Sequence, residues 1–181
     1  MRIIAGTCKG RRINAPKSIK ARPTTDFAKE GLFNVLNNIT TINKMKVLDL
    51  FAGTGNISYE FSSRGAEKVL AVDQQMSSFR FISEKAKELN LSIKCIKKDV
   101  FSFVTKANDE KFNLIFADPP YNLFKLDTLP DLILQSTLLD SSGILIIEHG
   151  NENDFSSHPN LIDKRTYSRV NFSFFKHFPF K

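Results

Sequence analysis

The sequence predicts an α/β protein with a mostly parallel, seven-stranded sheet that has helices on both faces. From residue 46 onward, short continuous apolar runs alternate with segments of helical periodicity, as in parallel strands that are buried on both sides. The C-terminal segment departs from this pattern, because its two strand-like runs have no helix between them. These two runs predict an antiparallel hairpin that closes one edge of the sheet.

The N-terminal segment is expected to form a small β-hairpin ahead of the sheet. The runs 2–6 and 11–15 flank Lys9-Gly10, which indicates a turn between two short strands. A basic linker follows over 16–23. Thr24-Thr25-Asp26 then offers capping residues for a first helix, whose apolar residues continue at helical spacing to Leu36. A polar loop is expected over 37–44.

The remaining elements follow in regular order. The expected parallel strands are 47–51, 69–72, 93–96, 113–117 and 143–148. The expected helices run from the loop Gly53-Thr54-Gly55 through Arg64, and over 77–89, 101–106 and 129–139, with a Ser-Ser-Gly turn before the fifth strand. The expected hairpin strands are 161–166 and 169–178. Together they give the seven strands.

Composition excludes several classes of protein. Hydrophobic residues make up 41% of the 181 residues and charged residues 25%, which is typical of a globular protein and not of a disordered one. The longest apolar stretches, such as 144–147, are far shorter than the ~20 residues of a membrane-spanning helix. The N-terminus has no secretory pattern. We therefore expect a cytoplasmic protein.

The cysteine and histidine residues predict no metal site. Cys8 and Cys95 are far apart and belong to no Cys-x-x-Cys pair, so we expect two reduced thiols. The three histidines are scattered without the spacing of metal ligands.

Basic residues concentrate at the two ends of the chain. Residues 1–30 hold eight Lys or Arg against two acids, and residues 164–181 hold five against none, within a net charge of +7. Basic ends on a more acidic middle indicate binding to a polyanion. An ordinary solvated basic surface would give the same count, so charge alone leaves both interpretations open.

Four acidic residues fall at the ends of expected strands, where ligands bind in an open α/β sheet. Asp49 precedes the glycine loop, and the glycines allow backbone to approach a ligand closely. Asp73 closes the second strand, where a carboxylate accepts both ribose hydroxyls. Asp99 follows the third strand and is placed to accept from an adenine amino group. Asp73 and Asp99 could alternatively be helix caps.

The glycine loop favours one kind of adenosine-containing ligand over another. Ser58 occupies the third glycine position of a dinucleotide fingerprint, and Asp49 would repel a pyrophosphate. A carboxylate there suits a cationic ligand such as S-adenosylmethionine (SAM). Glu148 also ends a strand, but no motif supports a site role, so we interpret it as structural.

Asp118-Pro119-Pro120-Tyr121 follows the fourth strand and is the most specific motif. The prolines stiffen the loop, so the Asp118 carboxylate and the Pro119 carbonyl can accept both protons of an exocyclic amine. This favours a pyramidal nitrogen with a free lone pair and stabilises the developing positive charge. Tyr121 is placed to stack on the base. A simple Asp-Pro-Pro turn is the alternative.

These motifs resemble the class I SAM-dependent methyltransferases, which have a Rossmann-like fold, and in particular their amino-methylating group. The resemblance extends to the bacterial RsmD family, which methylates N2 of a guanine in 16S rRNA. It rests on Arg2-Ile-Ile-Ala-Gly6, Lys9-Gly-Arg-Arg12, Arg22-Pro-Thr24, Leu32-Phe-Asn34, Asp49-Leu-Phe-Ala-Gly-Thr-Gly55, Ser63-Arg-Gly-Ala66 and Asp118-Pro-Pro-Tyr121. It covers residues 1 to about 150 and is weaker beyond them.

The resemblance implies a role for each motif. The residues implied to bind SAM are Asp49, Phe51, Ala52, Gly53, Gly55, Asp73, Asp99 and Val100. Those implied to bind and orient the guanine are Asp118, Pro119, Pro120 and Tyr121, and those implied to face RNA are Lys9, Arg11, Arg12 and Arg22. The expected organisation is one domain over 1–181, with hairpin and linker over 1–23 and a catalytic core over 24–181. The implied partner is 16S rRNA in a partly assembled small subunit, bound by a monomer.

Three other functions compete with this one. The Asp-Pro-Pro-Tyr loop recognises an amine and not a particular base, so a DNA adenine-N6 or other amino methyltransferase is the nearest alternative. The chain has no additional segment for flipping a base out of duplex DNA, which disfavours it. A non-catalytic rRNA-binding assembly factor would not need Asp118 and its loop. A dinucleotide-dependent oxidoreductase comes last.

Overall fold

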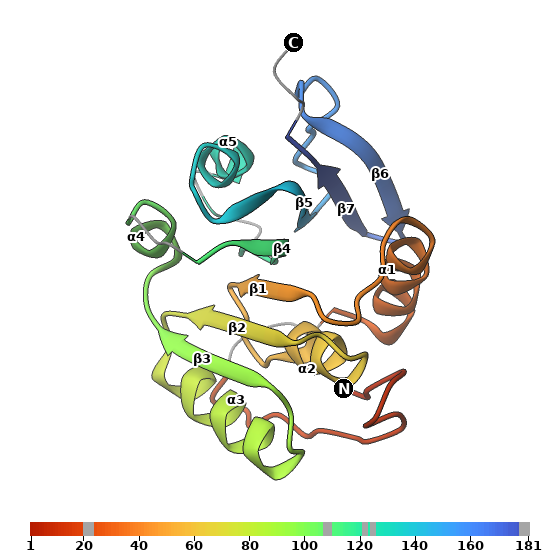
Figure 1. The fold of residues 1–181 in the computed structure, drawn as a ribbon, viewed down its shortest axis with the longest axis vertical. Coiled ribbons are helices and arrows are strands. Elements are labelled where there is room, and N and C mark those ends of the chain that lie inside the picture. Colours follow the sequence, from red (N-terminus) through yellow and green to blue (C-terminus); the bar gives the residue numbers. More distant parts are fainter. Residues whose placement is uncertain (20–23, 107–109, 121–122, 124–125, 178–181) are drawn as a thin grey trace.

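The computed structural model describes residues 1–19, 24–106, 110–120, 123 and 126–177. Its centre is a seven-stranded sheet with the order β3-β2-β1-β4-β5-β7-β6 (Figure 1). Strands β1 to β5 are parallel, and β7 is antiparallel to both β5 and β6. This confirms the predicted sheet and its C-terminal antiparallel hairpin.

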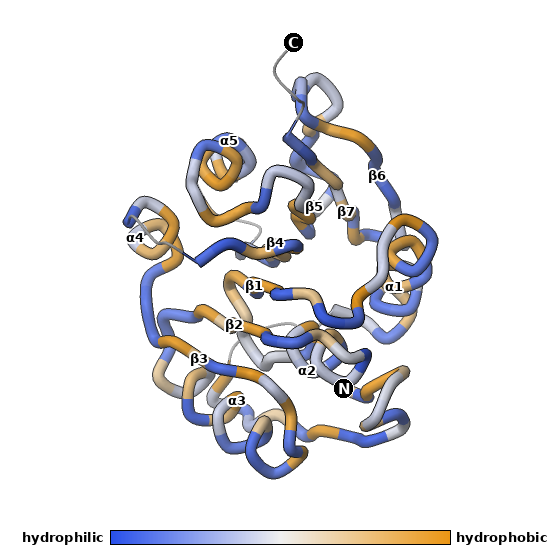
Figure 2. The backbone as a smooth tube through the Cα atoms, in the orientation of Figure 1, coloured by the Kyte–Doolittle hydropathy of each residue, from blue (hydrophilic) through white to orange (hydrophobic). Residues whose placement is uncertain are grey.

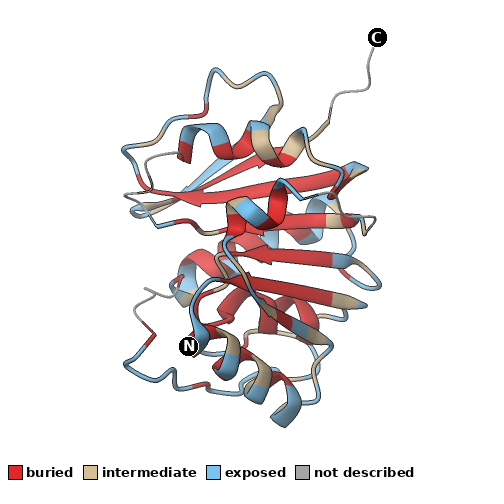
Figure 3. Cartoon of the chain, turned by 90° about the vertical axis from the view of Figure 1, so that its left-hand side faces the viewer, coloured by how far each residue is buried: buried red, intermediate tan, exposed pale blue. Residues whose placement is uncertain are grey.

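The strands agree closely with the apolar runs of the sequence. Their bounds are β1 Lys46–Leu50, β2 Lys68–Asp73, β3 Ile93–Lys97, β4 Phe112–Ala117, β5 Leu139–His149, β6 Leu161–Tyr167 and β7 Val170–Phe175. The central strands are buried along almost their whole length (Figure 3), as expected of parallel strands between two helical layers.

Helices cover both faces of the sheet. They are α1 Asp26–Ile39, α2 Asn56–Ser63, α3 Met76–Glu88, α4 Val100–Val104 and α5 Leu129–Leu134, with the short 3₁₀ helix η1 Leu126–Thr128. Alternate residues of β1 separate the two cores. Val47 packs with α1 and α2, whereas Leu48 packs with α4 and α5 on the other face. Figure 2 shows apolar residues gathered on the sheet and on the helix sides that face it.

The expected helix over 129–139 is wrong in its second half. The Ser136 hydroxyl donates to the Ile133 carbonyl at 2.6 Å, and the chain then leaves the helix. The Phe112 amide donates to the Leu138 carbonyl at 2.7 Å, so sheet pairing already begins there. The apolar residues at the end of the expected helix therefore belong to the sheet.

The expected Ser-Ser-Gly turn lies inside β5. The strand begins at Leu139, which pairs with Phe112, and the register then shifts until Ile144 pairs with Leu114. Within this irregularity Ser142 donates its backbone N–H and its hydroxyl to Asp140. The turn chemistry is present, but it makes a bulge and does not end the strand.

Two expectations near the N-terminus also need correction. The hairpin is reduced to a single antiparallel bridge between Arg2 and Arg12, flanked by backbone bonds such as Ile3 N–H to the Arg11 carbonyl at 2.9 Å. Helix α1 runs to Ile39, into the expected polar loop. Its Phe27 faces solvent with 66% of its surface exposed, and the Tyr167 ring stands edge-on beside it.

The described residues contain no helix that combines the length and apolarity needed to cross a bilayer, and the longest, α1, has 14 residues.

Candidate active site

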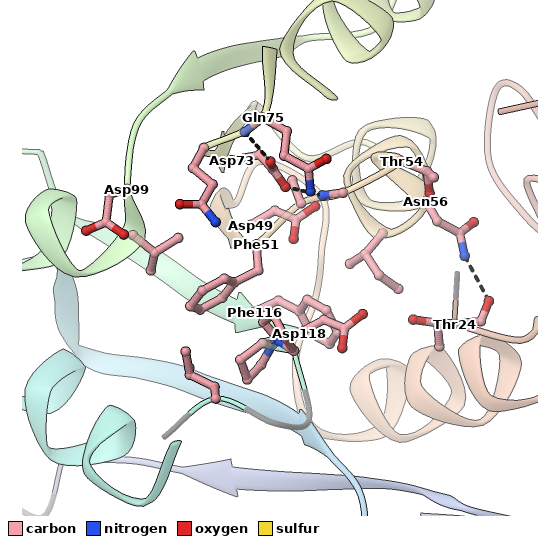
Figure 4. A pocket seen from close by; sticks show the side chains of 18 of the residues that line it. Thr24, Asp49, Phe51, Thr54, Asn56, Asp73, Gln75, Asp99, Phe116 and Asp118 are labelled. Carbon is pink, nitrogen blue, oxygen red and sulfur yellow. Dashed lines mark hydrogen bonds between the residues drawn. The ribbon is translucent and has the colours of Figure 1, made fainter. Parts of the chain in front are cut away.

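A pocket of about 510 Å³ opens at the carboxyl ends of β1 and β4. These neighbouring strands are where the chain order reverses, since β2 and β3 lie on one side and β5 on the other. Ligands bind at such switch points in open α/β sheets. Figure 4 shows Asp99 and Thr24 on opposite sides of the pocket, with Asp49 and Asp118 between them.

The glycine loop between β1 and α2 uses the backbone conformations that glycine allows, and Phe51 shares them. Phe51, Gly53 and Gly55 all have positive φ angles, of 58°, 53° and 75°. At Gly55 a Cβ would come within 2.9 Å of Ile82 and 3.0 Å of the Tyr59 ring, so only glycine fits. Phe51, Ala52 and Gly53 line the pocket. Gly55 does not, and its part is to shape the loop.

Asp73 holds this loop in place. One carboxylate oxygen accepts from the Gly53 N–H at 2.8 Å, and the other accepts from the Gln75 N–H at 2.8 Å. Each oxygen keeps a free lone pair, and the residue lines the pocket. Asp73 therefore combines a structural role with an acceptor edge suited to ribose hydroxyls.

Asp49 is a buried carboxyl beside the glycine loop. It is 2% exposed and accepts a hydrogen bond from the Ser58 hydroxyl, which explains why serine occupies the third glycine position. Burial is the main cause that raises its pKa to about 7. No ion pair within the described part of the chain reaches this carboxyl. A bound cation would stabilise its charged form, which is what a SAM site requires.

The far wall of the pocket is apolar. Phe51 and Phe101 stand edge to face with their ring centres 6.4 Å apart, next to Val100. Asp99 lies at the rim, is exposed, and caps α4 by accepting from the Ser102 N–H at 2.9 Å. It is thus both the helix cap considered above and a pocket residue.

The Asp118 loop forms the opposite side. The Asp118 N–H donates to the Leu50 carbonyl at 3.3 Å, which ties the loop to β1. Asp118, Pro119 and Pro120 line the pocket, and Asp118 is partly exposed to it. Burial, and next the charge of Glu148, raise the pKa of Asp118 well above its usual value. Tyr121 lies outside the described residues.

Two polar residues that the sequence pattern did not indicate belong to this region. The Thr24 hydroxyl, which lines the pocket, donates to the Glu148 carboxylate at 2.8 Å. The Thr24 carbonyl accepts from the Asn56 side chain at 3.0 Å, and Asn56 also lines the pocket. Thr24 was visible in the sequence only as a capping residue. Phe101 was likewise missed, because an apolar pattern does not separate a pocket wall from a core.

Of the implied RNA-facing residues, Lys9 lies on a turn away from the pocket. Lys9, Arg11 and Arg12 are exposed, and Arg22 lies outside the described residues. The turn that carries Lys9 packs on the end of α2, where the Thr7 N–H donates to the Ser63 carbonyl at 2.8 Å. The first residue of the same helix, Asn56, lines the pocket. A helix of eight residues, about 12 Å, therefore separates them.

The described residues contain no cluster of three or more His, Cys, Asp or Glu side chains arranged to hold a metal ion. The pocket residues do fit SAM. An apolar wall suits adenine, the Asp73 edge suits ribose, and a buried carboxyl without a counter-ion suits the cationic end. The fold and this pocket are those of a class I SAM-dependent methyltransferase.

Comparison with known proteins identifies the family. The family model described as "Conserved hypothetical protein 95", which is the RsmD family, matches residues 1–176, and the chain belongs to it. The chain is 34% identical to "Putative rRNA methyltransferase YlbH" of Bacillus subtilis over 156 residues, which are 84% of each chain. It is 29% identical to "Ribosomal RNA small subunit methyltransferase D" of Escherichia coli over 160 residues, covering 88% of this chain and 79% of that protein.

The solved structures agree on the fold. A hypothetical protein of Thermus thermophilus superposes with a TM-score of 0.86 over 98% of this chain and 99% of its own, at 23% identity.

Proposed function

We propose that this enzyme transfers the methyl group of SAM to the exocyclic N2 amine of a guanine in 16S rRNA, acting on a partly assembled small ribosomal subunit in the cytoplasm. The observation that carries the proposal is the position of Asp118. Its carboxyl faces a pocket whose other end, with an apolar wall and the Asp73 carboxylate, would suit an adenosine. Relatives that are named for ribosomal RNA support the substrate class.

The site residues would divide the work between two ligands. Asp73 would accept hydrogen bonds from the ribose of SAM and Asp99 from its adenine, while Asp49 would face its cationic end. Gly55 would shape the loop. The residues in contact with SAM would also include Phe51, Ala52, Gly53 and Val100. SAM, when bound, supplies an electrophilic methyl group on a sulfonium. Asp118 and the Pro119 carbonyl would accept hydrogen bonds from the two N–H groups of the amine, so that the nitrogen lone pair points at the methyl group of SAM. Tyr121 would stack on the base.

The basic N-terminal segment would hold the RNA backbone away from the reacting base. Lys9, Arg11 and Arg12 are exposed, and the turn that carries Lys9 lies about one helix length from the pocket. We propose that these residues and Arg22 contact phosphates, while the pocket receives a single unpaired base. In this proposal residues 1–23 bind RNA and 24–181 catalyse, within one monomeric domain.

The test compares three substrates with radiolabelled SAM: small subunits from cells that lack this methylation, naked 16S rRNA, and duplex DNA. We expect label in N2-methylguanosine from the subunits, with mapping of the position by primer extension. The Asp118→Ala variant is the matched control for adventitious labelling. Label in N6-methyladenine of DNA would overturn the substrate and keep the site. No label anywhere, with SAM still bound, would favour a non-catalytic assembly factor.

A further inference from the structure

A second carboxyl lies beside Asp118. In the parallel pairing of β4 with β5, Ala117 lies opposite Ile147, so the next residues, Asp118 and Glu148, follow side by side. Asp49 of β1 lies on the same face but two residues earlier in register, since it pairs with Phe116 of β4. Three carboxyls thus end three neighbouring strands on the face that carries α1 and α2.

Glu148 is held firmly in this position. It is 2% exposed, and one carboxylate oxygen accepts from the Thr24 hydroxyl at 2.8 Å. Across β7 it pairs with Phe172, which is apolar and buried. The surrounding structure therefore leaves its carboxyl facing Thr24 and the other two acids.

Among the residues that the structure describes, the charged groups around the pair provide no counter-ion. Within the described residues, no Lys, Arg or His forms an ion pair with Asp49, Asp118 or Glu148. Lys29 is the cation of the packed helix α1, but its ammonium is engaged with Glu60 at 3.4 Å and with the Arg2 carbonyl at 2.6 Å.

His149, the next residue on β5, does not serve as a counter-ion either. Its ring nitrogens bond the Gly150 carbonyl and the Ser173 hydroxyl, each at 2.8 Å, and burial lowers its pKa. Burial is also the main cause that raises the pKa of Glu148 to about 7, although the Thr24 hydrogen bond opposes the rise.

We propose that Asp118 and Glu148 share one proton in the ligand-free enzyme, and that Glu148, held by Thr24, is a positioning residue that sets the pH at which Asp118 becomes an acceptor. Two adjacent carboxyls, one buried and the other only partly exposed to the pocket, do not both ionise easily, because their charges repel each other. While Glu148 is ionised, Asp118 keeps the proton. This inference rests on the proposed methylation of an amine.

The shared proton gives the reaction a balanced path. When the amine docks, the Asp118 proton moves to Glu148, and the Asp118 carboxylate accepts the N–H. The nitrogen then forms its bond to the methyl carbon while the sulfur–carbon bond breaks, with the electron pair remaining on sulfur. The nitrogen's surplus proton passes to Asp118. The pair, now carrying two protons, returns one to solvent after the product leaves.

The first measurement needs no substrate. Infrared difference spectra of the ligand-free protein between pH 5 and 9 follow the C=O stretch of protonated buried carboxyls. Besides the signal of Asp49, whose pKa is about 7, we expect one such signal to persist through neutral pH in the wild type and to disappear at lower pH in Glu148→Gln, because Asp118 then loses its charged neighbour. An unchanged titration in Glu148→Gln would overturn the proposal.

The second measurement is the pH dependence of kcat with saturating SAM and undermethylated subunits. Glu148→Gln should move the acidic limb of the profile down by about one pH unit, the size of a typical like-charge effect. Thr24→Val should move it in the same direction by less, because loss of the hydrogen bond favours the proton on Glu148. Thr24→Ser keeps the hydroxyl and should leave the limb in place, as should Glu152→Gln, which removes an exposed charge nearby.

The two measurements separate the possible failures. A Glu148→Gln enzyme whose rate falls by the same factor at every pH would show a purely structural role and overturn the proposal. If the wild type methylates none of the RNA substrates, the proposed function fails, and the infrared titration still decides whether the carboxyls share a proton.

Discussion

Individual aspartates in this pocket differ in role because their partners differ. Asp73 accepts two backbone N–H groups, Asp49 accepts one serine hydroxyl in a buried place, and Asp99 caps a helix at the exposed rim. Asp118 stands beside another carboxyl. The same side chain can therefore anchor a loop, attract a cation or accept an amine, according to burial and hydrogen bonding.

Asp118→Ala tests the residue assigned to the amine. The variant should lose methyl transfer by about 10²–10³-fold, because a preorganised electrostatic partner of the transition state is removed. SAM affinity should remain within about twofold, since Asp118 would contact the acceptor base. Radiolabel transfer and isothermal titration calorimetry measure the two quantities. Wild-type activity in this variant would disprove the assignment.

The raised pKa of Asp49 predicts that SAM binding depends on pH. Its pKa of about 7 in the free protein means that it is mostly protonated at pH 6 and ionised at pH 8. A cationic ligand prefers the ionised form, so SAM should bind about tenfold more weakly at pH 6 than at pH 8. Calorimetry across this range measures it. Asp49→Asn should flatten the dependence, whereas the exposed Asp154→Asn should not.

Helix α2 is the element that joins the pocket to the N-terminal segment. Its Glu60 is fully buried and accepts from the Ile4 N–H at 2.8 Å, the Ala5 N–H at 3.0 Å and the Arg64 side chain at 2.8 Å. Lys29 of α1 completes the cluster at 3.4 Å. One buried carboxylate thus attaches the first residues of the chain to the core.

Lys29→Met should destabilise the protein by about 3–5 kcal/mol, because it leaves the buried Glu60 with less compensation for its charge. Urea unfolding followed by circular dichroism gives the free energy of unfolding. Lys68→Met is the matched control, since Lys68 pairs with Glu110 in a partly exposed position and its loss should cost less than about 1 kcal/mol. Equal losses in the two variants would contradict the assigned role of the cluster.

Sequence patterns predicted helices and strands well where the local periodicity defines them. They did less well where contacts between distant parts of the chain determine where an element ends. The buried parallel strands are apolar runs, so β1 to β4 were found within one residue at most ends. The helix over 129–139 was too long because apolar spacing does not show that Leu138 already joins the sheet. Glu148 was interpreted as structural because no motif supports a site role, and its contact with Thr24, 124 residues away, is not visible in a local pattern.

The whole molecule places its basic N-terminal turn and its pocket at opposite ends of α2. An RNA that contacts both must follow the surface of this helix for about 12 Å. This separation fits an RNA whose backbone binds to the N-terminal turn while a single base enters the pocket.

Reversing Arg11 and Arg12 to Glu should weaken binding of undermethylated subunits and reduce its salt dependence. Each lost phosphate contact lowers the slope of log K against log salt by about 1, so the double variant should lose about 2. Filter binding at several salt concentrations measures the slope. Lys111→Glu, an exposed position before β4, is the control. An unchanged slope in the double variant would remove this turn from the RNA interface.

The raised carboxyl pKa values also predict how the free protein responds to pH. A carboxyl whose pKa is higher in the folded than in the unfolded state favours folding at low pH, and this contribution is lost as pH rises from about 4 to about 7. Asp49 is such a group. Asp49→Asn should therefore raise Tm at pH 8, by roughly 2–4 °C for each kcal/mol, and raise it by only about a third as much at pH 5. Scanning calorimetry at both pH values tests the difference.

The bulge in β5 has a consequence for how this chain can vary in length. Inserting or deleting one residue within the regular part of β4 or β5 would turn the following carboxyl to the other face of the sheet, away from the pocket. The pairs from Leu114–Ile144 to Ala117–Ile147 run without interruption, and the irregularity lies before them, at the sheet edge remote from the site. Residues can therefore be inserted at that remote end of the strands while the Asp118 and Glu148 carboxyls stay aligned.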